Sequence, residues 1–130
     1  MIHLDTSFLI RGLARNSPED AQLRTWLRDG MPLGISSVSW AEFLCGPVRA
    51  SEVELAALII PEPVPFIAAD STLTARLFEL AGRRRGSLAD CMIAATAIRM
   101  GAPLATSDSA DFRRFVPAGL ELITVRPSAR

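Results

Sequence analysis

The feature that most constrains the fold of this chain is the alternation of short apolar segments with longer segments of helical periodicity. Gly, Pro or polar capping residues separate most of these segments from one another. We predict strands at residues 1–4, 33–36, 64–69, 103–106 and 120–125. We predict helices at residues 6–14, 17–29, 39–45, 51–60, 70–85 and 87–100, with a polar turn and a short helix within 107–115. Alternating strands and helices favour a largely parallel sheet covered by helices on both faces.

This pattern predicts a single α/β domain over residues 1–130, with three α/β/α layers around a central, mostly parallel sheet. Segment 64–69 contains Pro65, which limits it to a strand start or an edge strand. Segment 87–100 is apolar on nearly all sides, so we expect a buried helix. Right-handed crossovers place the carboxyl ends of parallel strands at one edge of a sheet, where ligands bind in open α/β folds.

The charge composition narrows the classes of function. The 14 basic and 14 acidic residues give a net charge of +0, so the chain lacks the bulk positive charge typical of nucleic-acid-binding proteins. Segregated surface charge would still allow such binding. All the basic residues are Arg and none is Lys.

The remaining composition argues against a thiolate or imidazole metal site and against a membrane protein. There is one His, and Cys45 and Cys91 show no paired spacing, so we expect two free, buried thiols. No apolar run reaches the roughly 18 residues that span a bilayer, and no secretory signal is visible. We therefore expect a cytoplasmic protein.

Four acidic residues occur at a strand end or in the first turn of a helix, and a fifth lies close to the last of them. They are Asp5, Glu42, Asp90 and Asp108, with Asp111 nearby. In a parallel α/β sheet these places converge on one edge, so the sequence predicts that the carboxylates meet in one pocket.

Each of these acids also has a purely structural explanation as a helix cap. Two patterns fit capping boxes, Ser39-x-x-Glu42 and Ser87-x-x-Asp90. The other acids precede or open a helix and fit as caps themselves. Asp90 fits this explanation least well, because its helix is otherwise almost wholly apolar and a buried carboxylate is costly unless it is paired or binds a metal. With no Lys in the chain, only an Arg could neutralise it.

A cluster of carboxylates points to a hard divalent cation. Carboxylates in one pocket repel each other and raise each other's pKa, and Mg²⁺ or Mn²⁺ relieves this conflict while keeping several waters. Such a metal supports hydrolysis of a phosphodiester. Thr6, Ser7, Thr106 and Ser107 either orient ligands and water there or satisfy backbone groups at the strand ends. The run Arg83-Arg84-Arg85 either holds RNA phosphates or is a solvated helix end.

The acidic residues lie in four short blocks that together resemble a known family. The blocks are Leu4-Asp5-Thr6-Ser7, Ser39-x-x-Glu42-Phe43-Leu44, Leu88-Ala89-Asp90-Cys91-Met92-Ile93-Ala94-Ala95 and Leu104-Ala105-Thr106-Ser107-Asp108-x-x-Asp111-Phe112. In this order they resemble PIN-domain ribonucleases, above all the VapC-type toxins of prokaryotic type II toxin–antitoxin pairs. The resemblance runs from residue 1 to about residue 112; segment 46–69 matches no part of the family pattern.

The resemblance implies Mg²⁺- or Mn²⁺-dependent endonucleolytic cleavage of single-stranded RNA or tRNA. It also implies a homodimer and an antitoxin whose tail enters the acidic groove, in a dimer of heterodimers or a larger assembly. Asp5, Glu42 and Asp90 carry over as catalytic, metal-binding acids. For the fourth position Asp108 is the first choice and Asp111 the second.

Three other functions share parts of this pattern. A receiver-like signalling module would carry a pair of acids after the first strand and a Lys after a late one, and this chain has neither. A phosphatase with an Asp nucleophile needs Asp-x-Asp, whereas Asp5 is followed by Thr6-Ser7. A catalytically inert PIN-fold interaction module would be expected to lack one or more of the acids.

Overall fold

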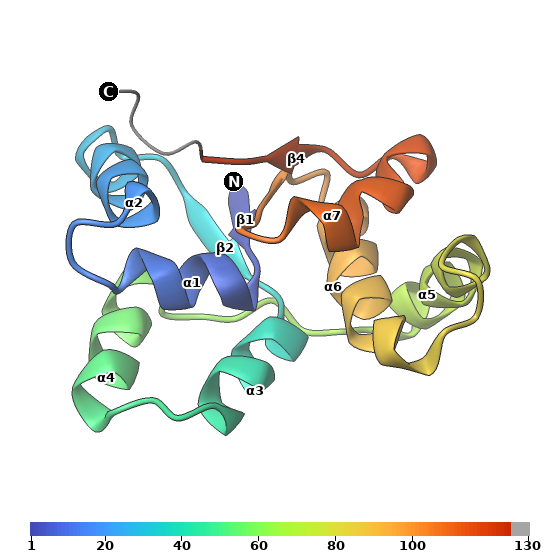
Figure 1. Cartoon of the computed structure of the whole chain (residues 1–130), viewed down its shortest axis with the longest axis horizontal. Helices are drawn as coiled ribbons and strands as arrows, with labels where there is room; N and C mark the ends of the chain where they lie inside the picture. Colours follow the sequence, from blue (N-terminus) through green and yellow to red (C-terminus); the bar gives the residue numbers. More distant parts are fainter. Residues whose placement is uncertain (126–130) are drawn as a thin grey trace.

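The computed structural model describes residues 1–125 and contains a four-stranded parallel sheet in the order β2-β1-β3-β4 (Figure 1). The strands are β1 (Ile2–Leu4), β2 (Leu33–Ile35), β3 (Leu104–Ala105) and β4 (Leu122–Ile123). Leu4 lies opposite Ile35 on one side and Ala105 on the other, and Ala105 lies opposite Ile123. This register aligns the carboxyl ends of all four strands at one edge.

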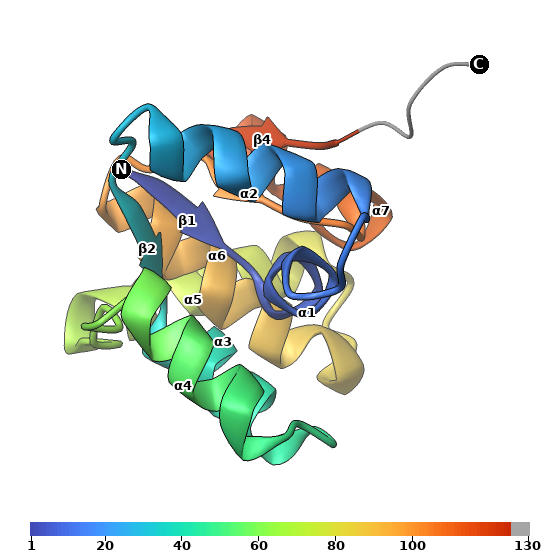
Figure 2. The same cartoon turned by 90° about the vertical axis from the view of Figure 1, so that its left-hand side faces the viewer.

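Helices follow the strands as predicted. They are α1 (Thr6–Gly12), α2 (Pro18–Arg28), α3 (Ser37–Cys45), α4 (Ala50–Ile59), α5 (Ala68–Leu80), α6 (Leu88–Arg99) and α7 (Ser109–Phe112), with 3-10 segments η1 (Arg85–Ser87) and η2 (Arg113–Ala118). Figures 1 and 2 show α1, α2 and α4 on one side of the strands and α5 and α6 on the other. The predicted three-layer α/β/α architecture with a parallel sheet is confirmed.

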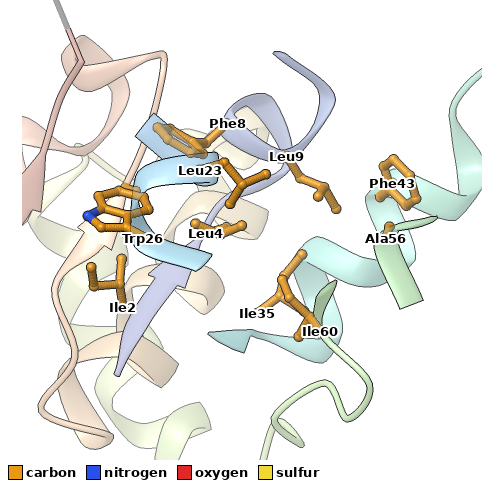
Figure 3. Close-up of a cluster of buried hydrophobic side chains, with 11 residues drawn as sticks. Ile2, Leu4, Phe8, Leu9, Leu23, Trp26, Ile35, Phe43, Ala56 and Ile60 are labelled. Atoms are coloured by element: carbon orange, nitrogen blue, oxygen red, sulfur yellow. The ribbon is translucent and has the colours of Figure 1, made fainter. Parts of the chain in front are cut away.

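The core consists of two hydrophobic clusters, one on each face of the sheet. The first packs β1 and β2 against α1 to α4 through residues such as Leu4, Phe8 and Ile35, all fully buried (Figure 3). The second packs α5, α6 and η2 around Leu104. Successive side chains of a strand point to opposite faces, and Leu104 and the adjacent Ala105 accordingly belong to different clusters. Burial on both faces holds the short strands, and with them the carboxyl edge, in a fixed position.

The predicted strand at 64–69 is wrong. Only one isolated bridge forms there, between Ser36 and Val64, and α5 already begins at Ala68. Pro65 has no N–H to donate to a ladder, which prevents the pairing from continuing. Asp70 therefore lies in the first turn of α5, where it accepts a hydrogen bond from the Ile67 amide at 3.1 Å.

Asp70 instead ties α5 to α6. Its side chain is fully buried and pairs with Arg99, with an Nε–Oδ1 distance of 2.5 Å, and it also accepts a bond from the Thr96 hydroxyl at 3.1 Å. The helix predicted at 87–100 begins at Leu88, and its centre, Cys91 and residues 93–97, is buried as predicted, whereas Leu88 and Met100 at its ends are exposed. Cys91 is buried as expected, but Cys45 at the end of α3 is exposed, which corrects the prediction that both thiols are buried.

Among residues 1–125, no helix is both long enough and apolar enough to cross a bilayer.

Candidate functional site

All five predicted acids line one cleft at the carboxyl edge of the sheet. The cleft has a volume of about 290 Å³, and its carboxylates are those of Asp5, Glu42, Asp90, Asp108 and Asp111. They come from the end of β1, from α3, from the first turn of α6 and from the region of α7. The predicted convergence of acids that are distant in sequence is therefore present in the structure.

Asp5 is both a helix cap and a wall of the cleft. One carboxylate oxygen accepts from the Phe8 amide at 2.8 Å and from the Ser7 hydroxyl at 2.9 Å, so the predicted N-cap of α1 is confirmed. The other oxygen accepts from the Thr106 hydroxyl at 2.5 Å. Burial, opposed by these hydrogen bonds and reinforced by the nearby Asp108 charge, raises the pKa of Asp5 from 3.8 to about 6. Asp5 lines the cleft but is only 3% exposed, so its carboxylate has little contact with solvent.

Glu42 does not form the capping box that its spacing suggested. α3 begins two residues earlier, at Ser37, and Ser36 caps it by accepting from the Ser39 amide at 3.0 Å. Glu42 instead accepts from the Thr6 hydroxyl of α1, with an Oγ1–Oε1 distance of 2.8 Å. The carboxylate is therefore oriented by a neighbouring helix toward the cleft.

Asp90 projects from the first turn of α6 and also does not serve a capping box. The Ser87 hydroxyl donates to the carbonyl of Arg84 at 2.6 Å and makes no capping bond to α6. Burial first, and then the charges of the other cleft acids, raise the pKa of Asp90 from 3.8 to about 6, while Arg114 opposes the shift. The structure thus explains the one acid in an apolar helix: it belongs to a shared carboxylate pocket.

The structure brings both candidates for the fourth acid into the cleft. Asp108 precedes α7 without capping it, and its backbone amide donates to the Thr106 hydroxyl at 2.9 Å. Asp111 lies in the first turn of α7 and raises the pKa of Asp90, whereas Asp108 raises that of Asp5. The two acids therefore act on different parts of the same cleft.

Two of the hydroxyl groups predicted near the acids, those of Ser7 and Thr106, satisfy backbone amides after β3, which is one of the two roles considered for them. Ser7 and Thr106 donate to Asp5, and their oxygens accept from the amides of Ser107 and Asp108. The same two hydroxyl groups therefore satisfy backbone amides of the loop after β3 and hydrogen-bond the carboxylate of Asp5.

Two relevant residues were missed at the sequence level. Glu19 is 7% exposed and accepts from the Ser107 hydroxyl at 2.7 Å, which anchors the loop after β3 to α2. Its position in a helix-start pattern gave no reason to expect this contact. Arg114 lies near Asp90, and only its proximity in sequence to Asp111 gave a signal.

The Arg83-Arg84-Arg85 run divides into residues with different surroundings. Arg83, in the turn after α5, pairs with Glu79 near the end of that helix at 3.0 Å. Arg84 and Arg85 are both exposed; Arg84 lines a cavity that adjoins the acidic cleft, whereas Arg85, at the start of η1, does not line it.

The donor set suits a hard divalent cation that retains water. None of the five cleft acids forms an ion pair within residues 1–125, so their charge is left for another cation to balance. In the same residues, no three acidic, His or Cys side chains converge closely enough to ligate one ion together. Mg²⁺ usually takes only one or two direct carboxylates and fills its remaining positions with water and phosphate oxygens, so the acids present fit such an ion.

The fold and the cleft define an all-parallel α/β domain with a carboxylate-lined pocket at the carboxyl edge of its sheet. The model of the PIN domain family matches residues 2–116, and the chain therefore belongs to the PIN domain family.

Solved structures with the same fold come from several bacteria. A chain in the crystal structure of VapBC2 from Rickettsia felis, bound to a DNA fragment from its promoter, superposes with a TM-score of 0.76 at 22% identity, covering 97% of this chain and 100% of that one. A chain of FitAcB from Neisseria gonorrhoeae gives 0.71 at 21% identity, with coverages of 95% and 96%. A chain of VapBC-5 from Mycobacterium tuberculosis, a member of the VapBC family of toxin–antitoxin systems, gives 0.60 at 24% identity, with coverages of 97% and 98%. No curated protein sequence matches the chain significantly.

Proposed function

We propose that this protein is a metal-dependent endoribonuclease that acts as the VapC-type toxin of a type II toxin–antitoxin pair. The observation that carries the proposal is the convergence of five carboxylates, from four parts of the chain, in one cleft where none of them pairs with an Arg of residues 1–125. Membership of the PIN domain family supports the nuclease activity. The VapBC and FitAcB complexes among the similar folds support the toxin role.

In this proposal Asp5, Glu42, Asp90 and Asp108 form the metal site, with Asp111 beside them; one or two of these carboxylates would bind the ion directly and the others would bind it through its water ligands. Mg²⁺, with Mn²⁺ as a substitute, would neutralise charge on the reacting phosphodiester and promote attack by water. The chain's own contribution is to orient the acids. The hydroxyl groups that bind Asp5 and Glu42 fix their oxygens, and hydrogen-bonded supports of this kind typically change metal affinity by 10–100-fold.

The substrate would be single-stranded RNA or tRNA, and the partner a cognate antitoxin that blocks the cleft. A homodimer, joined with antitoxin in a dimer of heterodimers or a larger assembly, accords with this role. The toxin–antitoxin complexes named above support the antitoxin partner.

The test is cleavage of a panel of RNAs by protein freed of antitoxin, in Mg²⁺, in Mn²⁺ and in EDTA. We expect cleavage with either metal, none in EDTA, and a loss of at least about 100-fold in Asp90→Asn. Glu54→Gln is the matched control, because Glu54 is an exposed acid of α4 outside the cleft. A wild-type protein that binds antitoxin but leaves every RNA intact would instead be an inert PIN-fold interaction module.

A further inference from the structure

A second cavity, of about 390 Å³, adjoins the acidic cleft and differs from it in charge. The two cavities share Asp90 and Asp111, and the remaining wall of the second one includes Arg84, Ser87 and Arg114. These residues come from the turn between α5 and α6, from η1 and from the segment after α7 (Figure 1). A continuous surface thus leads from carboxylates to guanidinium groups.

The backbone that carries Arg84 is held in place by its neighbours. After α5 ends at Leu80, Gly82 and Arg83 adopt left-handed conformations with φ of 71° and 57°, and the chain turns there. The carbonyl of Arg84 then accepts two hydrogen bonds from Ser87, at 2.9 Å from the amide and 2.6 Å from the hydroxyl. The start of this side chain therefore has a defined position at the mouth of the cavity.

Arg114 is positioned by packing. Its guanidinium carbon lies 5.8 Å from the centre of the Phe115 ring, and Phe115 is fully buried. Such a cation–π contact restrains the guanidinium. Within residues 1–125, neither Arg84 nor Arg114 forms an ion pair, whereas Arg83 is engaged by Glu79.

The charges select the kind of group that this cavity binds. A guanidinium presents a planar set of donors that matches a phosphate, and two of them attract one strongly. Asp90 and Asp111 form the shared wall and repel a free anion. A phosphate therefore binds here best when it is part of a strand whose adjacent phosphate is already held in the acidic cleft.

We infer that Arg84 and Arg114 bind the phosphodiester next to the scissile one and so set the direction in which single-stranded RNA crosses the cleft. This inference rests on the proposed nuclease function. It assigns RNA binding to one member of the Arg83-Arg84-Arg85 run and adds Arg114, which is distant from the run in sequence.

The direct test is RNA binding by Arg84→Gln/Arg114→Gln. A fluorescently labelled single-stranded RNA of mixed sequence is titrated with antitoxin-free protein, with Ca²⁺ replacing Mg²⁺ and with the RNA checked on a gel for integrity. We expect binding about tenfold weaker than wild type, as when hydrogen bonds to a charged group are removed. The slope of log affinity against log salt should become shallower by about 0.7 for each phosphate that the variant no longer binds.

Two further variants make the result specific. Arg83→Gln/Arg85→Gln removes the same charge from the same region but from residues that do not line the cavity, and it should change affinity less than about twofold. Arg84→Lys/Arg114→Lys keeps the charge without the planar fork and should recover only part of the affinity. Thermal melting confirms that each variant is folded.

Measuring both RNA binding and RNA cleavage distinguishes a failure of the inference from a failure of the proposed function. If wild type cleaves RNA but the Arg84/Arg114 variant binds as the control does, the inference is overturned and the nuclease proposal stands. If wild type binds RNA with the expected dependence on these arginines but does not cleave in Mg²⁺ or Mn²⁺, the nuclease proposal fails and the phosphate site stands. Absence of RNA binding by wild type overturns the inference.

Discussion

Asp5→Asn should make the metal-free protein more stable near neutral pH, although it removes a residue that caps α1. Burial raises the pKa of Asp5 to about 6 from 3.8. A carboxyl group whose pKa is higher in the folded state binds its proton more tightly there, so ionisation at higher pH favours unfolding. Asn keeps the side-chain oxygen that can accept from the Phe8 amide and is as good a cap as Asp.

The magnitude follows from the shift in pKa. A difference of about 2 pKa units corresponds to about 3 kcal/mol of destabilisation above the folded-state pKa. The substitution weakens the bond from the Thr106 hydroxyl, at a cost of about 1 kcal/mol. Asp5→Asn should therefore raise the free energy of unfolding by about 2 kcal/mol near pH 7.5.

The sign of this effect depends on pH. The penalty in wild type is full above pH about 6 and disappears as the pH falls through the unfolded-state value of 3.8. Between about pH 7.5 and about pH 4, wild type should therefore gain about 2 kcal/mol relative to Asp5→Asn. Comparing the two proteins at each pH cancels the contributions of the other titrating groups.

The assay is urea denaturation in EDTA at several pH values, repeated with saturating Mg²⁺. Mg²⁺ at 100 times its dissociation constant should stabilise wild type by about 2.7 kcal/mol and Asp5→Asn much less. The reasoning is refuted if Asp5→Asn is less stable than wild type in EDTA near neutral pH and the difference does not change with pH. Glu54→Gln, outside the cleft, serves as the control and should show no such dependence.

Three other substitutions test the supports of the site and the fold. Thr6→Val removes the hydroxyl that orients Glu42 and should weaken Mg²⁺ binding about tenfold by calorimetry, with the fold unchanged by circular dichroism. Arg99→Gln leaves the Asp70 carboxylate buried without its ion-pair partner and should cost about 3 kcal/mol in urea denaturation; a loss below about 1 kcal/mol would argue against a tight pair. Glu19→Ala removes the buried acceptor that anchors the loop after β3, and it should lower kcat about tenfold while leaving KM within about twofold. An unchanged kcat would show that the loop keeps its position without this contact.

Much of the fold was predictable because the signals for it are local. Apolar strands, helical periodicity, and Gly and Pro breaks occur within windows of a few residues, and they predicted the alternation that yields a parallel sheet. The failure at 64–69 has a local cause as well: the apolar residues there resembled a strand, but Pro65 cannot donate to a ladder and the chain enters α5.

The sequence alone determined where the acidic residues lie relative to the predicted strands and helices. The alternation of these elements predicted that the acids meet at the carboxyl edge of a parallel sheet. The sequence did not decide between a cap and a site for any one acid, because a carboxylate at the start of a helix satisfies both patterns. Only the tertiary structure made that distinction. It showed that Asp5 both caps α1 and lines the cleft, turned Glu42 toward Thr6 across 36 positions of sequence, and placed Arg84 and Arg114 in one cavity. These contacts depend on how α1, α3, α6 and η2 pack against the sheet, and no local pattern encodes that packing.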